Sequence, residues 1–169
     1  QIDPFGGDVT AIAALDDALI IFKESAIYAV AGPGPLRNPE VGGPSDGFSQ
    51  PALVTSDVGC LSQRSLAITP AGLIFQSAKG IYLLDRSRQV SYIGAPVEAY
   101  NAQRVARATL VDDTTQVRFL TDSGRTLLFD YLYGQWSTWT NHEGVDAVVC
   151  GGVYHYVRND GRVFREDAT

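Results

Sequence analysis

The fold is decided by one stretch, Leu73-Ile74-Phe75-Gln76-Ser77-Ala78-Lys79-Gly80-Ile81-Tyr82-Leu83-Leu84. It combines an apolar strand, a short polar turn at Lys79-Gly80 and a second apolar strand that contains Ile81-Tyr82. Residues 19–30 align with it without a gap, as Leu19-Ile20-Ile21-Phe22-Lys23-Glu24-Ser25-Ala26-Ile27-Tyr28-Ala29-Val30. An ungapped internal repeat of this kind predicts a β-hairpin unit that the chain uses more than once.

Two further copies of the hairpin follow. One runs from Val117 to Phe129 and turns at Asp122-Ser123-Gly124-Arg125, and the other runs from Val153 to Phe164 and turns at Asn159-Asp160-Gly161-Arg162. Both turns place glycine where a hairpin requires a positive φ angle. The sequence therefore predicts four related hairpins.

Further strands complete each unit. A β-like segment precedes every hairpin, at residues 9–15, 65–69, 104–111 and 145–149. Two units continue into a fourth strand, Asp85 leading to residues 89–93 and Asp130 leading to residues 135–139, and we expect each Asp to hold its own turn. Four antiparallel strands at a spacing of about 40 to 50 residues are typical of propeller blades. We predict an all-β protein, a β-propeller or part of one, made of consecutive four-stranded antiparallel blades.

The connections carry their own signals. Five of the eight prolines lie between Ala31 and Asp57, so residues 31–57 are predicted to be one long Pro/Gly-rich inserted loop. Its apolar residues, Leu36, Val41, Phe48 and Leu53, are expected to contact a neighbouring subunit or another protein. The only predicted helix spans residues 96–101, because Pro96 can start it.

Length and composition limit the class of protein. The 169 residues predict a single propeller-like domain over 1–169, and the absence of methionine at its start suggests a processed product or a piece of a longer chain. A net charge of −6 argues against tight or sequence-specific nucleic-acid binding by this chain alone, and no apolar run is long enough to span a membrane. Cys60 and Cys150 are expected to be free, buried thiols.

Candidates for chemistry are few. The titratable residues that we weighed are Asp16, Asp17, Asp112, Asp113, His142, Glu143, Asp146 and His155. Adjacent aspartates on a strand point to opposite faces, and Asp is a common turn residue, so we interpret the pairs as turns and both histidines as surface or half-buried. We predict no catalytic, metal or cofactor-binding residue and no cofactor. Four aromatic residues could stack on a sugar, although strand alternation favours burial of at least one tryptophan: Tyr131, Tyr133, Trp136 and Trp139.

Three segments support a resemblance to a known family. They are Gly59-Cys60-Leu61-Ser62-Gln63-Arg64-Ser65, the run from Thr69 to Tyr82, and Gly161-Arg162-Val163-Phe164-Arg165-Glu166-Asp167, alongside the hairpin from Leu19 to Tyr28. They resemble the β-propeller of bacteriophage tail proteins, in particular the nozzle or stabilisation proteins of short-tailed phages. This chain is far shorter than such proteins usually are.

The resemblance implies a structural role in a virion. It implies a ring, often hexameric, that is built from copies of the chain with other tail proteins, assembled in the host cytoplasm, and that extends the DNA conduit used in DNA ejection. We therefore expect a virion structural protein of the phage tail. The alternative is a carbohydrate-binding or glycan-hydrolysing β-propeller.

Overall fold

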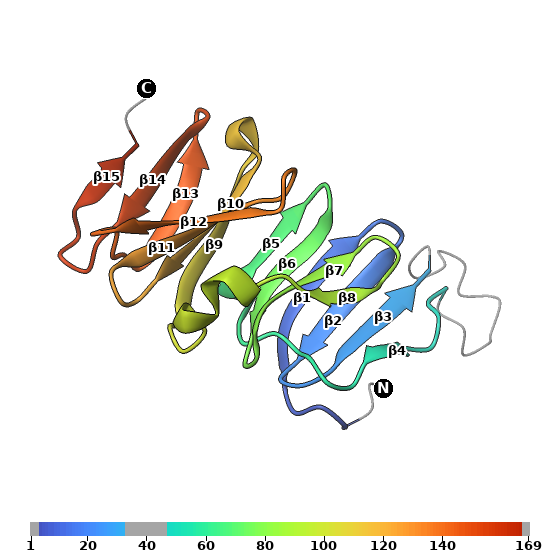
Figure 1. The fold of residues 1–169 in the computed structure, drawn as a ribbon. Helices are drawn as coiled ribbons and strands as arrows, with labels where there is room; N and C mark the ends of the chain where they lie inside the picture. Colours follow the sequence, from blue (N-terminus) through green and yellow to red (C-terminus); the bar gives the residue numbers. More distant parts are fainter. Residues whose placement is uncertain (1–3, 33–46, 167–169) are drawn as a thin grey trace.

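A computed structural model describes residues 4–32 and 47–166, and Figure 1 shows them as a row of antiparallel sheets. There are four sheets, and within each one the neighbouring strands follow one another along the chain. No α-helix occurs in the described ranges, so the predicted all-β class is confirmed. The sheets at the two ends of the row lie at opposite ends of the molecule, and the described residues form no closed ring (Figure 1).

The first sheet has a fourth strand that sequence analysis placed in a loop. It consists of β1 (Val9–Leu15), β2 (Ala18–Lys23), β3 (Ile27–Ala31) and β4 (Ala52–Thr55). The last of these lies inside the predicted loop 31–57, so that loop was drawn too long. The pairing is possible because Pro51 precedes β4 at a sheet edge, where a missing N–H costs no ladder bond.

The second sheet repeats the register of the first. It consists of β5 (Leu66–Thr69), β6 (Gly72–Ser77), β7 (Gly80–Asp85) and β8 (Val90–Tyr92). Tyr28 lies opposite Ile21 and Tyr82 lies opposite Phe75, which are the positions that the ungapped alignment equates. The predicted equivalence of the two Ile-Tyr strands is confirmed.

The remaining two sheets differ in strand number. The third contains β9 (Val105–Val111), β10 (Gln116–Thr121), β11 (Arg125–Asp130) and β12 (Gln135–Thr140). The fourth has three strands in the described part of the chain, β13 (Asp146–Cys150), β14 (Val153–Val157) and β15 (Val163–Arg165). Gly124 and Gly161 have φ angles of 82° and 81°, as the hairpin turns were predicted to require.

Short 3₁₀ turns join the strands. The segment η2 (Ala95–Tyr100) confirms a helical connection where one was predicted, with Pro96 near its start and a kink at Val97. Two single turns, η1 (Gln63–Ser65) and η3 (Asp112–Thr114), were not predicted, since three residues leave no periodic pattern. No helix in the described ranges is both long and apolar enough to cross a membrane.

Successive sheets pack face to face. Alternating side chains of the first sheet, such as Phe22, meet Phe75 of the second, with ring centroids 4.9 Å apart. The other face of the second sheet packs on the third through Ile74, Ile81 and Phe119. The third sheet packs on the fourth through apolar residues of both. Burying an aliphatic or aromatic side chain contributes about 1.5–3 kcal/mol, so these cores stabilise the packing of each sheet on the next.

The two cysteines differ in environment. Cys60 is buried in the core between the first two sheets, and its Sγ donates to the Ser62 carbonyl at 3.2 Å. Cys150 is exposed, which corrects the prediction that both thiols are buried. The reason is that Cys150 ends β13 on the face that points away from the third sheet.

Candidate interaction sites at the ends of the sheet stack

The paired aspartates sit in turns. Asp16 has a φ angle of 53° in the turn between β1 and β2 and forms an ion pair with Arg86, while Asp17 lies 3.5 Å from Arg88. Asp112 lies in η3 and accepts a hydrogen bond from the Tyr131 hydroxyl at 3.0 Å. The turn interpretation is confirmed for these residues, and exposed ion pairs of this kind contribute little to stability.

The histidines and their acidic neighbours do not converge. His142 is half-buried, its ring centroid 5.0 Å from that of Trp139 and 5.2 Å from that of Tyr156. His155 is also half-buried, and its Nδ1 lies 2.9 Å from the Val153 carbonyl oxygen. Asp146 lies 3.5 Å from Arg107 instead. Across 4–32 and 47–166, His, Cys, Asp and Glu form no group of three that could hold a metal ion.

The aspartates that begin two fourth-strand turns act as predicted. Oδ1 of Asp130 accepts hydrogen bonds from the backbone N–H groups of Leu132 and Tyr133, at 2.9 and 3.0 Å. Asp85 accepts one from the N–H of Gln89 at 2.9 Å and one from the Ser87 hydroxyl. The Ser87 hydroxyl, followed by the Gln89 N–H, holds the pKa of Asp85 below its usual value. Both carboxylates therefore hold turns in place.

The structure describes two of the four residues that were predicted to make contacts. Leu36 and Val41 lie outside the described residues. Phe48 and Leu53 are both exposed, at 48% and 53%. Leu53 is a strand residue, placed on β4 directly opposite Tyr28. Its side chain lies on a sheet face, so the prediction that Leu53 belongs to a loop was wrong.

The first sheet has an outer face, turned away from the second sheet. Strand alternation places Ile12, Leu19, Ile21, Tyr28 and Leu53 on it, because their neighbours in sequence fill the core. Ile12, Leu19 and Leu53 are exposed. In the second sheet the equivalent face, with Phe75 and Tyr82, is the one that packs against the preceding sheet.

The fourth sheet also has an outer face, turned away from the third sheet. Val148 and Val163 are 57% and 65% exposed on it, and the half-buried Val157 and His155 lie between them. A hollow of about 580 Å³ on this face has a mainly apolar lining. Sheet faces in the interior of the stack are covered by a neighbour, whereas this one is open in the described part of the chain.

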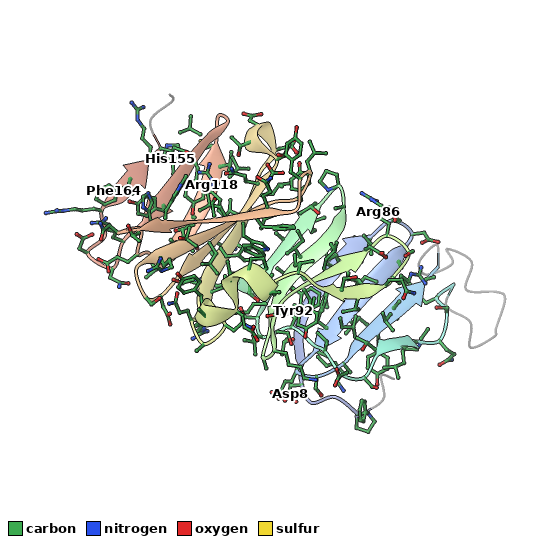
Figure 2. All side chains as sticks on the ribbon, in the orientation of Figure 1. Asp8, Arg86, Tyr92, Arg118, His155 and Phe164 are labelled. Atoms are coloured by element: carbon green, nitrogen blue, oxygen red, sulfur yellow. The ribbon has the colours of Figure 1, made fainter. Side chains whose placement is uncertain are left out.

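An aromatic cleft opens between the third and fourth sheets. Its volume is about 560 Å³. Strands β12, β14 and β15 and the residues that follow them supply its lining: Thr138, Trp139, Thr140, His142, Tyr154, Tyr156, Phe164, Arg165 and Glu166. The rings of Tyr156 and Phe164 stack with centroids 5.3 Å apart. Figure 2 shows Arg118 and Phe164 at this end of the molecule.

A buried charge lies beside the cleft. Arg118 is 1% exposed, and its guanidinium carbon lies 4.5 Å from the Trp139 ring centroid and 4.7 Å from that of Tyr154. It also forms a bidentate ion pair with Glu166. Two rings and a carboxylate offset the cost of removing the charge from water. Arg118 thereby ties the third sheet to the segment after β15.

One buried polar group at the cleft has no partner. The hydroxyl of Tyr154 is buried and makes no hydrogen bond among the described residues, although the side chain lines the cleft. Burial raises the pKa of Tyr154 well above its ordinary value. Leaving a buried hydroxyl unpaired costs about 1–3 kcal/mol, so this atom lowers the stability of the packed sheets.

Sequence analysis missed this cleft but anticipated part of its wall. The prediction that at least one tryptophan is buried is confirmed only in part. Trp136 is half-buried against the core, its ring centroid lies 4.7 Å from that of Phe129, and its Nε1–H donates to the Ile93 carbonyl at 2.8 Å. Trp139 faces the cleft instead. The overlooked signal is Arg118 within the apolar run 117–120, since a charge there requires a buried partner.

Comparison with known proteins provides a fold relationship. No family model and no curated protein matches the chain. The crystal structure of the computationally designed Ika4 protein is similar with a TM-score of 0.54 and 13% identity, over 98% of this chain and 94% of that one. PorZ, a surface component of the type-IX secretion system of Porphyromonas gingivalis, is 12% identical with a TM-score of 0.40, and the match covers 95% of this chain but only 27% of that one. At these identities the likeness to Ika4 concerns the fold alone.

Proposed function

We propose that the four sheets are consecutive blades of a β-propeller and that the chain is a non-catalytic structural module, which assembles through the outer faces of its first and fourth sheets. The observation that carries this proposal is the apolar outer face of the fourth sheet, with Val148 and Val163 more than half exposed. Adjoining exposed apolar residues on one face are typical of an interaction surface.

The repeat supports the mode of assembly. The second and third sheets each bury both faces, so the outer faces of the first and fourth sheets are the places where the same packing would continue. Stacking the fourth sheet of one copy on the first sheet of the next joins two different surfaces. Such a heterologous contact makes a closed ring when the rotation closes and a filament when it does not.

The oligomeric state tests this proposal. We expect the purified chain to self-associate in sedimentation velocity, and Val148→Asp to shift it to monomer, because the change buries an unpaired carboxylate in the interface. Leu132→Asp is the matched control, since Leu132 is 63% exposed in a turn away from both faces. A wild-type chain that stays monomeric at high concentration would contradict the proposal.

The setting that we propose for this module is the tail of a virion. It rests on the sequence resemblance to phage tail propellers, with copies of the chain and other tail proteins as partners and the DNA conduit at the centre. Mass spectrometry of separated tails and heads from the source particle is the direct test. The chain should be found with the tails, and its absence from purified particles would refute the setting.

A second candidate is carbohydrate binding, and the aromatic cleft is the observation that favours it. Its lining pairs aromatic rings with Arg165 and Glu166, a combination that can stack on and hydrogen-bond to a sugar. However, Tyr156 is already stacked on Phe164, and Trp139 already covers Arg118. A glycan array separates the candidates, because specific sugar binding is not expected of the structural module.

A further inference from the structure

We propose that a hollow between the second, third and fourth sheets binds a free α-amino acid with an apolar side chain. Arg64 and Arg104 hold the carboxylate of this ligand, and Asp122 holds its ammonium group. The hollow lies between sheets rather than on an outer face of the stack, so the inference goes beyond the proposed assembly.

The hollow lies where the first strands of three sheets begin. Strand β9 contacts η1, β5 and β13 (Figure 1), and residues that lead into these strands line a space of about 230 Å³. At about 30 Å³ for each water molecule, this is room for roughly eight waters, which suits a small metabolite better than a drug-sized molecule. All of the lining residues fall within 62–159, away from both ends of the chain.

Backbone hydrogen bonds hold the charged residues of the hollow in place. The carbonyl of Arg104 accepts the Asp122 N–H at 3.1 Å, which places the turn between β10 and β11 beside the start of β9. The N–H of Arg64 donates to Ser62 Oγ at 3.0 Å, which holds the short turn η1. These segments are therefore ordered without a ligand, and a preformed site loses less entropy when it binds one.

The three charged side chains at the hollow have no ion-pair partner in the described part of the chain. Arg64, Arg104 and Asp122 all line the hollow and are exposed at its mouth. Within residues 4–32 and 47–166 no ion pair includes any of them. Two cations and one anion thus face one small space without neutralising one another.

This arrangement of charge fits a zwitterion. A guanidinium group presents its N–H donors in a planar fork that matches a carboxylate. The carboxylate of Asp122 accepts hydrogen bonds from an ammonium group and repels a dianion such as phosphate. An α-amino acid carries its carboxylate and its ammonium on the same carbon atom, so both can be bound within a space of this size.

The rest of the lining favours an apolar ligand side chain. Val105, Ala106 and Val145 contribute to the wall, and Val105 is buried while Val145 is exposed. Contact with these residues removes apolar surface of the ligand from water, which stabilises the complex. Apolar walls also reduce the competition from water for the ionic groups, so the charged contacts are stronger than on an open surface. Leucine is the probe that combines these features.

Titration with leucine tests the proposal. Amide NMR spectra of the isotope-labelled chain should show saturable shifts with L-leucine, with a dissociation constant of about 1 mM or lower. Isocaproate, which is leucine without its amino group, and isoamylamine, which is leucine without its carboxylate, are the matched analogues. Each lacks one of the two charged contacts, so each should bind at least about 5-fold more weakly than leucine.

Variants of the chain assign each contact. Arg64→Gln and Arg104→Gln should each weaken leucine and isocaproate by about 5-fold or more, because each removes a charge that faces the carboxylate. Asp122→Asn should weaken leucine by a similar factor and leave isocaproate bound at least as tightly, because it removes a negative charge near that anion. Arg162→Gln is the matched control, since Arg162 is exposed and does not line the hollow, and it should change leucine binding by less than about 2-fold.

Several outcomes would overturn the proposal. It is wrong if leucine causes no saturable shift, if isocaproate or isoamylamine binds as tightly as leucine, or if Arg162→Gln weakens leucine as much as Arg104→Gln does. It is also wrong if sulfate displaces leucine at an equal concentration, because the hollow would then be a general anion site. Val148→Asp, which tests the outer face of the fourth sheet, should leave leucine binding unchanged, so self-association and ligand binding can fail independently.

Discussion

Arg118 of the third sheet stacks over the Tyr154 ring of the fourth, with 4.7 Å between the guanidinium carbon and the ring centroid. This contact places a permanent charge inside the packing of two sheets. It is stable because the Trp139 ring also contacts the guanidinium, with its centroid 4.5 Å away, and Glu166 neutralises the charge. Trp139, Tyr154 and Glu166, which contact this arginine, also line the aromatic cleft, so the packing and the candidate site share three residues.

Replacing this arginine should separate its volume from its charge. We expect Arg118→Ala to lower the free energy of unfolding by about 3 kcal/mol, because it leaves a cavity beside the Trp139 and Tyr154 rings. It also leaves the Glu166 carboxylate without its cationic partner. Arg118→Met should cost only about 1 kcal/mol, because it refills most of the space without a charge. Urea denaturation measures both. Equal losses would mean that the ion pair, and not the packing, dominates.

The core between the first two sheets should depend on its aromatic pair. Phe22 and Phe75 are both fully buried, and their ring centroids lie 4.9 Å apart. Phe22→Ala should lower the free energy of unfolding by about 3–5 kcal/mol. Leu132→Ala, at an exposed turn, should change it by less than about 0.5 kcal/mol. A small effect of Phe22→Ala would contradict the packing of these two sheets.

The sequence predicted those parts of the fold that depend on contacts between residues close together along the chain. The hairpins were predictable because Ile27-Tyr28 and Ile81-Tyr82 repeat within short segments, and hydrogen bonds to near neighbours fix their register. The strand β4 was missed because four residues among prolines and glycines give little alternation.

The cleft could not be predicted for a different reason. Its surroundings combine Arg118, Trp139, Tyr154 and Glu166, which come from four separate segments. Those segments meet only because one sheet stacks on the next, and the lateral offset between two stacked sheets is set by side-chain packing rather than by any local pattern. The arginine in an apolar strand was the single local sign that something unusual is buried there.

The alkaline limb of stability should report on Tyr154. Burial raises the pKa of its hydroxyl, so the folded chain holds this proton more tightly than the unfolded chain does. Below the unfolded pKa of about 10 the hydroxyl is protonated in both states, and the free energy of unfolding decreases as the pH rises above that value. Tyr154→Phe should remove this part of the pH dependence and, at neutral pH, raise the free energy of unfolding by about 1 kcal/mol, because an unpaired hydroxyl is deleted.

The measurement compares urea denaturation of the wild type and Tyr154→Phe at neutral and alkaline pH. The difference between the two proteins is the informative quantity, since burial also raises the pKa of Tyr82 and of Tyr131. A difference that does not change with pH would show that Tyr154 titrates as an ordinary tyrosine. A Tyr154→Phe variant that is less stable at neutral pH would show that the hydroxyl has a partner after all.

The two thiols should react at very different rates. Cys150 is exposed at the end of β13, whereas Cys60 is buried between sheets, and burial raises the pKa of its thiol. Reaction with a disulfide reagent requires an accessible thiolate. Cys60 is neither accessible nor readily deprotonated, so it should react slowly. We expect one thiol to be titrated rapidly in the native chain and the second only after denaturation. Cys150→Ser should abolish the rapid phase, and Cys60→Ser should leave it intact. Two rapid equivalents in the native chain would mean that the first two sheets separate readily, because Cys60 can be reached only when they part.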